Sequence, residues 1–196
     1  MRDSDGQPIL DQVMPDYDVV LAERVTVSAD PSTTLRAARE LDLLTVHSPI
    51  LDTAMWIRGL PARLAGRAAP VPPRLVIADG GLPGWLVLGE SGREFTFGAV
   101  GRFWTPIIIW RDVAQGEFAA FDQPGWGKIA ANFVVTTQGA GTVLGYECRT
   151  ATTDPVARRR FLRYWWLVRP FVGHIMRAAL KSIKADAEWR YCGSSP

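Results

Sequence analysis

Residues 154–189, DPVARRRFLRYWWLVRPFVGHIMRAALKSIKADAEW, carry the clearest structural signal in the chain. Asp154 is a residue type that caps helices, and proline suits the first helical position, so a helix is predicted to begin at Pro155. Apolar side chains then recur at steps of three and four residues: Phe161, Trp165, Val168, Val172, Ile175, Ala179 and Ile183. This spacing predicts one long helix with an apolar stripe, which Pro170 should bend near its middle.

The segment directly before this helix, residues 128–152, has the pattern of a strand hairpin. With a turn at residues 138–141, one mostly apolar face carries the pairs Thr137–Thr142, Val135–Leu144, Phe133–Tyr146 and Ala131–Cys148. The other face carries Lys128, Asn132, Thr136, Glu147 and Arg149 and is predicted to face solvent. A slip of one residue on one strand would mix the two faces, which supports this register.

The rest of the chain adds a strand, two short helices and more strands. Alternating apolar residues predict a strand over residues 17–28, with Glu23 on its apolar face. Asp30-Pro31 and Ser48-Pro49 each predict a helix start, and residues 61–83 form a long connection rich in proline, glycine and alanine. Strands follow at 85–89, 94–99 and 107–110. A sheet made of these strands and wrapped around the final helix would enclose a cavity.

Length and composition favour a soluble single-domain protein. The chain has 196 residues, a net charge of +2 and two cysteines, so neither a nucleic-acid partner nor a disulfide framework is predicted. We see no signal peptide, membrane span, metal-ligand spacing or cofactor motif, and expect a cytoplasmic protein. Residues 1–15 are predicted to be a disordered extension, 16–190 a single domain and 191–196 a tail; the oligomeric state stays open.

The order of elements resembles the START-like, or helix-grip, superfamily (SRPBCC), which includes bacterial polyketide cyclase/dehydrase-like proteins and lipid-transfer domains. The resemblance rests on the Asp30-Pro31 helix start, the turn at residues 90–94, the hairpin before Asp154-Pro155 and the run at 160–165. It implies an α+β helix-grip fold: a curved antiparallel sheet around a long C-terminal helix, with two short helices after the first strand. It also implies an apolar cavity between the sheet and that helix.

Aromatic residues are the main candidates for a binding site, since a cavity lined by rings suits a flat apolar ligand. The predicted ligand-binding residues are Phe97, Arg102, Trp104, Trp110, Phe133, Tyr146, Trp166 and Met176. Each ring could equally be core filling. Arg102 could bind an anionic group or stack on Trp104, and Tyr146 could orient a ligand through its hydroxyl.

Three functions stay open at this level. The first is binding of a small hydrophobic or amphipathic molecule, similar to a lipid or polyketide. The second is a cyclase or dehydrase that uses Tyr146, Arg102, Glu23 or His174 as acid or base. The third is a peripheral membrane protein, in which Arg158, Arg159, Arg160 and Arg163 meet anionic lipid; it requires an exposed apolar face beside these arginines.

Overall fold

The protein is described by a computed structural model that covers residues 7–42, 84–139 and 141–193. Its elements are α1 (Ile9–Val13), β1 (Val19–Val27), α2 (Pro31–Arg39), β2 (Trp85–Glu90), β3 (Glu94–Arg102), β4 (Ile109–Arg111), η3 (Gln115–Glu117), β5 (Gly127–Gln138), β6 (Gly141–Thr152) and α4 (Pro155–Gly193). The strands form one antiparallel sheet in the order β1-β6-β5-β3-β2, with β4 paired to β3.

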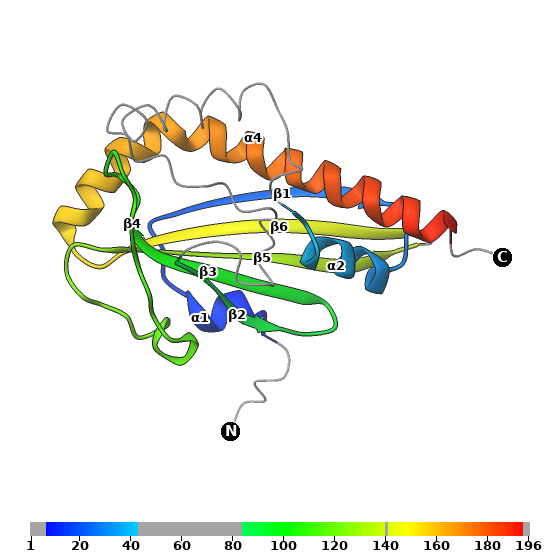
Figure 1. The fold of residues 1–196 in the computed structure, drawn as a ribbon, viewed down its shortest axis with the longest axis horizontal. Helices are drawn as coiled ribbons and strands as arrows, with labels where there is room; N and C mark the ends of the chain where they lie inside the picture. Colours follow the sequence, from blue (N-terminus) through cyan, green and yellow to red (C-terminus); the bar gives the residue numbers. More distant parts are fainter. Residues whose placement is uncertain (1–6, 43–83, 140, 194–196) are drawn as a thin grey trace, which may run out of the picture.

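This architecture confirms the predicted α+β class and helix-grip arrangement, in which an open antiparallel sheet is followed by a long C-terminal helix (Figure 1). The first predicted short helix is α2, where the Asp30 carboxylate accepts a hydrogen bond from the Thr33 amide at 3.0 Å. The second predicted helix, at Ser48-Pro49, and the connection at 61–83 lie outside the described residues.

The β5–β6 hairpin has the predicted register. Phe133 lies opposite Tyr146, Val135 opposite Leu144 and Ala131 opposite Cys148, and Gln138 faces Gly141 across the turn. On its other side β6 pairs with β1, so β6 is an interior strand of the sheet. We call the face that carries Phe133 and Tyr146 the inner face, because it is the face toward α4.

Helix α4 begins where the sequence predicts. The Asp154 carboxylate accepts hydrogen bonds from the amides of Val156 at 2.7 Å and Ala157 at 2.9 Å, and Pro155 is the first helical residue. The helix then continues to Gly193, so residues 191–193 are helical rather than part of the expected tail. Pro170 lies inside the helix, and Figure 1 shows that the first turns are inclined to the rest.

Helix α4 does not lie centrally over the sheet. It packs against β1, β6 and α2, whereas α2 packs against β5, β6 and β3. Buried side chains of the inner face, α2 and the second half of α4 form the main core, which includes Leu35, Phe97, Phe133, Leu144 and Ile183. The half of the sheet beside β2 therefore lies away from α4, and this offset shapes the inner face.

The outer face of the sheet is covered where solvent was expected. Leu10 and Met14, at and just after α1, pack with Leu88, Val100 and Phe118 in a second core on this face. Residues 9–14 are therefore folded, which differs from the expected disordered extension. The prediction of a solvent-facing polar face is wrong for Asn132, 4% exposed, and Arg149, 9% exposed, because α1 lies over this part of the sheet.

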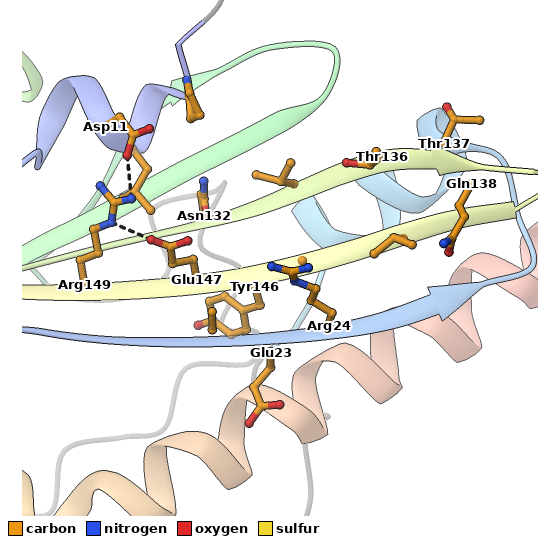
Figure 2. Close-up of a pocket in the computed structure, with 16 residues that line it drawn as sticks. Asp11, Glu23, Arg24, Asn132, Thr136, Thr137, Gln138, Tyr146, Glu147 and Arg149 are labelled. Carbon is orange, nitrogen blue, oxygen red and sulfur yellow. Dashed lines mark hydrogen bonds and ion pairs between the residues drawn. The ribbon is translucent and has the colours of Figure 1, made fainter.

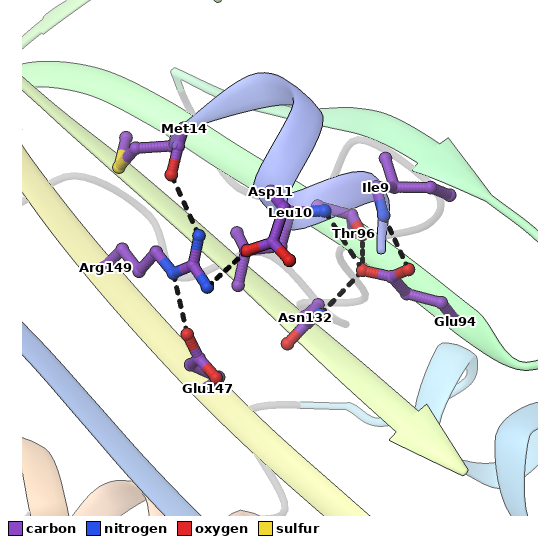
Figure 3. Close-up of polar contacts among 9 residues, drawn as sticks. All are labelled: Ile9, Leu10, Asp11, Met14, Glu94, Thr96, Asn132, Glu147 and Arg149. Carbon is purple, nitrogen blue, oxygen red and sulfur yellow. Dashed lines mark hydrogen bonds and ion pairs between the residues drawn. The ribbon is translucent and has the colours of Figure 1, made fainter. Parts of the chain in front are cut away.

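Two polar clusters hold α1 on the sheet (Figure 3). The carboxylate of Glu94 accepts hydrogen bonds from the amides of Ile9 at 2.8 Å and Leu10 at 3.1 Å. The same carboxylate accepts from the side chains of Thr96 at 3.0 Å and Asn132 at 2.6 Å. Arg149 forms the second cluster and donates to the Met14 carbonyl, Asp11 and Glu147. The Glu94 carboxylate and the Arg149 guanidinium thus both have hydrogen-bond partners at the contact between helix and sheet, whereas the buried Asn132 Oδ1 has none among the described residues.

Candidate functional site

A row of aromatic rings crosses the inner face, with one ring from each strand between β2 and β6. The ring centroids of Tyr146 and Phe133 are 4.5 Å apart, and those of Phe133 and Phe97 are 5.6 Å apart. Trp85 continues the row 5.7 Å from Phe97, and Trp110 of β4 lies 6.2 Å from Trp85. The sheet twist and the strand register bring these five side chains together, although they lie far apart in the sequence.

The row extends beyond the sheet to the first turns of α4. Phe103, at the end of β3, lies 5.9 Å from Trp110 and 6.4 Å from Trp104. The Trp104 ring is 6.4 Å from that of Phe161, on α4, which in turn is 5.8 Å from Trp165. The rings therefore form one continuous apolar surface from β6, across the sheet, to the beginning of α4.

Two glycines make room for these rings. Gly84, before β2, has φ +77°, and a Cβ atom on it would lie 2.6 Å from the Cβ atom of Trp110. On Gly101, in β3, a Cβ atom would lie 2.8 Å from the Phe103 ring. Any other residue at either position would push an indole or phenyl ring out of the row, and Gly84 also adopts a backbone conformation that glycine favours.

The inner face is unevenly buried. Phe97 and Phe133 are each 1% exposed. By contrast, five inner-face residues that pack against this core are partly exposed: Val25, Trp85, Val87, Tyr146 and Cys148. The partly exposed members of the row are therefore Trp85, Trp110 and Tyr146, whereas its central rings, Phe97 and Phe133, are core.

The inner face carries two protic groups among its apolar side chains. Burial raises the pKa of the Tyr146 phenol well above its usual value, so this group stays protonated at physiological pH. In the part of the chain that the structure describes, no hydrogen bond is formed by the Tyr146 hydroxyl. Cys148, two residues further along the same face, has its thiol pKa raised to about 12, first by burial and then by the charge of Glu147.

The raised pKa predicts a slow reaction of Cys148 with thiol reagents. The thiolate is the reactive form, and a pKa near 12 in place of 9 lowers its population about a thousandfold near neutral pH. We expect dithionitrobenzoate to react with one fast thiol, the exposed Cys192, and with Cys148 only after unfolding. The control is Cys192→Ser, which should remove the fast phase; a fast phase that persists in this variant would contradict the assignment.

Glu23, a candidate acid/base group, lies at the contact between β1 and α4, and His174, another candidate, is on α4. Glu23 is opposite Tyr146 in the β1–β6 register, but its carboxylate binds the Arg177 guanidinium at 2.6 Å. Gly173 leaves room for this pair, since a Cβ atom there would approach Arg177 Nη1 to 3.3 Å. His174 is half-buried beside that glycine. Glu23 thus ties the edge strand to the helix instead of facing the rings.

The structure places the predicted ligand-binding residues in three groups. One group lies along the aromatic row and comprises Phe97, Trp104, Trp110, Phe133 and Tyr146. Met176 is buried on α4 at 1% exposure. Arg102 lies apart: it donates to the Gly125 carbonyl at 3.0 Å and stacks 4.5 Å from the Trp126 ring, which belongs to the outer core. Trp166 also lies apart, at 83% exposure.

Sequence reasoning misses Trp85 and chooses the wrong neighbour in one aromatic pair. The sequence assigns Trp85 to a strand, but its inner-face position is evident only from its pairing with Ala99 of β3. On α4 the apolar stripe already contains Trp165, which is half-buried beside Phe161. Trp166 is rotated by about 100° around the helix axis from its neighbour and so faces away from the stripe.

A hollow of about 540 Å³ lies on the outer face between α1 and strands β1, β5 and β6, and Glu23 and Tyr146 also border it (Figure 2). Its lining includes Leu10 and Asp11 from the helix region and Arg24, Asn132, Glu147 and Arg149 from the strands. Charges of both signs and side chains of mixed polarity make this groove unlike the aromatic inner face. Within the described residues, no group of three metal-binding side chains is found, and no helix combines the length and apolarity needed to cross a membrane.

In comparisons with known proteins, no family model matches the chain and no curated protein matches it in sequence. Solved structures with a similar path of the backbone include TTHA0849 from Thermus thermophilus, at 12% sequence identity and a TM-score of 0.31. The alignment covers 91% of this chain and 100% of that one. CalU16 from Micromonospora echinospora has 11% identity and a TM-score of 0.29, covering 89% and 86%. Human STARD10 has 11% identity and a TM-score of 0.29, covering 87% and 65%. These similarities are low, so the proposed function rests on the side chains of this chain.

Proposed function

We propose that the protein binds a small, flat hydrophobic or amphipathic molecule on the inner face, between the sheet and α4. The observation that carries the proposal is the accessible part of the aromatic row. Tyr146 and Trp85 remain half-buried on a face that is otherwise core, and Val87 beside them is also half-buried. Apolar surface left accessible on the inner face is favourable to fill with an apolar molecule.

The Tyr146 hydroxyl supports a ligand with one polar group. It is a protonated donor in an apolar setting and makes no hydrogen bond among the described residues. A polar group in such a place gains a net 0.5–1.5 kcal/mol, roughly, from a hydrogen bond. A carbonyl or hydroxyl oxygen on the ligand would supply the acceptor, while the rings of Phe133 and Trp85 would contact its apolar body.

Binding without chemical conversion accounts for the placement of the candidate acid/base groups better than catalysis does. Of those four groups, only Tyr146 lies within the aromatic row, because Arg102 stacks on Trp126 and Glu23 pairs with Arg177. One hydroxyl is sufficient to orient a ligand. General acid–base catalysis by the predicted set would need at least a second group within hydrogen-bond reach of the same substrate.

The test uses the full chain, a hydrophobic fluorescent probe and two space-filling variants. Val87→Trp places an indole on the inner face next to Phe97, whereas Ala22→Trp places one on the outer face, where Ala22 lines the groove beside α1. We expect Val87→Trp to abolish the fluorescence rise of anilinonaphthalene sulfonate and Ala22→Trp to leave it unchanged. Organic extraction followed by mass spectrometry would identify any ligand retained through purification.

Tyr146→Phe provides a finer test, because it removes the hydroxyl and keeps the ring. Affinity for an extracted ligand that carries an oxygen acceptor should fall about three- to tenfold, the equivalent of one hydrogen bond, with unfolding by urea almost unchanged. Probe binding that survives Val87→Trp but is lost in Ala22→Trp would place the ligand in the outer groove. That result, or a complete lack of probe binding by the wild type, would overturn the proposal.

A further inference from the structure

The first half of α4 exposes an unusual amount of apolar surface. Five large apolar side chains on this part of the helix are exposed: Trp166 at 83%, Leu167 at 63%, Val156 at 49%, Phe171 at 40% and Leu162 at 39%. Leu162 and Trp166 are four residues apart, as are Leu167 and Phe171, so each pair is adjacent on the helix surface. We call these five residues the α4 outer patch. Large exposed apolar areas mark interaction surfaces, whereas single exposed apolar residues are common.

The same turns are strongly basic. Arg158, Arg159, Arg160, Arg163 and Arg169 all fall within them, and no aspartate or glutamate occurs between Pro155 and Ala185. Arg158 forms an ion pair with Asp18 at 2.9 Å. Within the described part of the chain, however, Arg159, Arg163 and Arg169 have no ion-pair partner. Positive charge is therefore available beside the apolar patch.

Two exposed isoleucines lie at and just before the start of β4. Ile107 is 61% exposed, and Ile109, opposite Arg102 in the register, is 47% exposed. The segment that leads into β4 begins at Trp104, whose ring contacts Phe161 of α4. Figure 1 accordingly shows β4 reaching the first half of α4. The isoleucines and the α4 outer patch thus lie at the same end of the molecule.

We infer that this end of the molecule docks on an anionic phospholipid membrane, with the first half of α4 lying along the surface. Tryptophan is suited to the headgroup level, where its ring meets apolar chains and its N–H meets water. Leucine and phenylalanine would enter the acyl boundary, and the unpaired arginines would meet lipid phosphates. A nucleic acid would use the arginines but leave the large aliphatic side chains exposed to water.

Vesicle flotation of the full chain tests the inference. We expect the protein to float with vesicles of phosphatidylcholine and phosphatidylserine and to stay behind with phosphatidylcholine alone. Raising the salt from about 0.1 M to about 1 M shortens the screening length from roughly 10 Å to 3 Å and should release a large part of the bound protein.

Paired variants separate the two contributions. Trp166→Ser combined with Leu167→Ser should lower the partition coefficient at least tenfold, and the matched control Trp189→Ser, at 76% exposure near the other end of α4, should not lower it. Arg159→Glu combined with Arg163→Glu should also lower it at least tenfold. The matched control is Arg24→Glu, on the outer face of β1 and pointing away from α4 (Figure 2). All these side chains are exposed, so circular dichroism should show unchanged folding.

Three results would overturn the inference. One is equal binding to neutral and anionic vesicles, or to neither. Another is vesicle binding that both double variants leave intact. The third is a different occupant: a dimer that the Trp166 and Leu167 variant converts to monomer in sedimentation, or an RNA probe that the arginines bind in place of vesicles. None of these outcomes depends on the inner-face ligand, so they leave the proposed function untouched.

Discussion

Replacing Glu94 with alanine is expected to lower the free energy of unfolding by about 3 kcal/mol or more. Glu94 is 5% exposed, and its carboxylate accepts hydrogen bonds from four donors. Alanine would leave the amides of Ile9 and Leu10, the Thr96 hydroxyl and the Asn132 amide without this acceptor. A buried donor left unsatisfied costs about 1–3 kcal/mol, and water entering the vacated space would recover part of the sum.

The same substitution should release α1 from the sheet before the rest of the protein unfolds. Hydrogen exchange at residues 9–14 should accelerate more than exchange in β5 or β6, since Glu94 is the main polar contact of the first turn of α1. Urea denaturation gives the global stability. The matched control is Glu90→Ala, at the surface end of β2, where the side chain is 51% exposed and pairs with Arg39. That change should cost no more than about 1 kcal/mol.

Glu94→Gln separates the charge from the shape of the side chain. Its amide oxygen can still accept from Ile9 or Leu10, but its NH₂ group would point at remaining donors and gain no bond from them. We expect a loss of stability between those of Glu94→Ala and the wild type. If Glu94→Ala proved as stable as Glu90→Ala, the carboxylate would not be what holds α1, and the apolar contacts of Leu10 and Met14 would have to suffice.

Phe133→Ala is expected to lower the free energy of unfolding by about 3–5 kcal/mol. Phe133 is 1% exposed and lies at the centre of the aromatic row, 4.5 Å from the Tyr146 ring and 5.6 Å from that of Phe97. Removing the ring deletes apolar contacts on both sides and leaves a cavity that the surrounding strand backbones cannot close. Equilibrium unfolding in urea would measure the loss.

Two controls frame the Phe133 result. Phe133→Leu keeps most of the volume and should cost clearly less than the alanine variant, while Trp189→Ala removes a larger ring at 76% exposure and should change stability by about 0.5 kcal/mol or less. In both comparisons, the expected loss of stability depends on how deeply the replaced side chain is buried. A loss below about 1 kcal/mol for Phe133→Ala would mean that the centre of the inner face is loosely packed rather than a core.

The hairpin and the two capped helices were the most predictable features. Their signals are local: an aspartate before proline for α2 and α4, and an alternation of apolar residues that admits one register in β5 and β6. The aromatic row was partly predictable for the same reason, because alternation assigns Phe97, Phe133 and Tyr146 to one face of their strands. The alternation does not predict which of these rings are exposed to solvent.

The errors share a different cause. The segment around α1 is short and lacks a clear apolar period, so its folding depends on Glu94, which is 85 residues away from Ile9. Stacking on Trp104 is one of the two roles predicted for Arg102, but Trp104 lies beyond the end of β3, and Arg102 stacks instead on Trp126 on the outer face. Trp166 was assigned to the site although the helical period places its neighbour Trp165 on the buried stripe.

Local sequence patterns predict the long helix from residue 155, the order of the strands along the chain, the hairpin register and the supply of aromatic residues. These follow from interactions within one turn or between adjacent strands, which residue periodicity and caps report directly. Long-range packing, in contrast, places α4 against β1 and β6, α1 over the outer face, and exposed apolar side chains beside the arginines of α4. Those outcomes depend on packing between segments far apart in the chain, where the fit of whole surfaces, and not any local pattern, sets the lowest free energy.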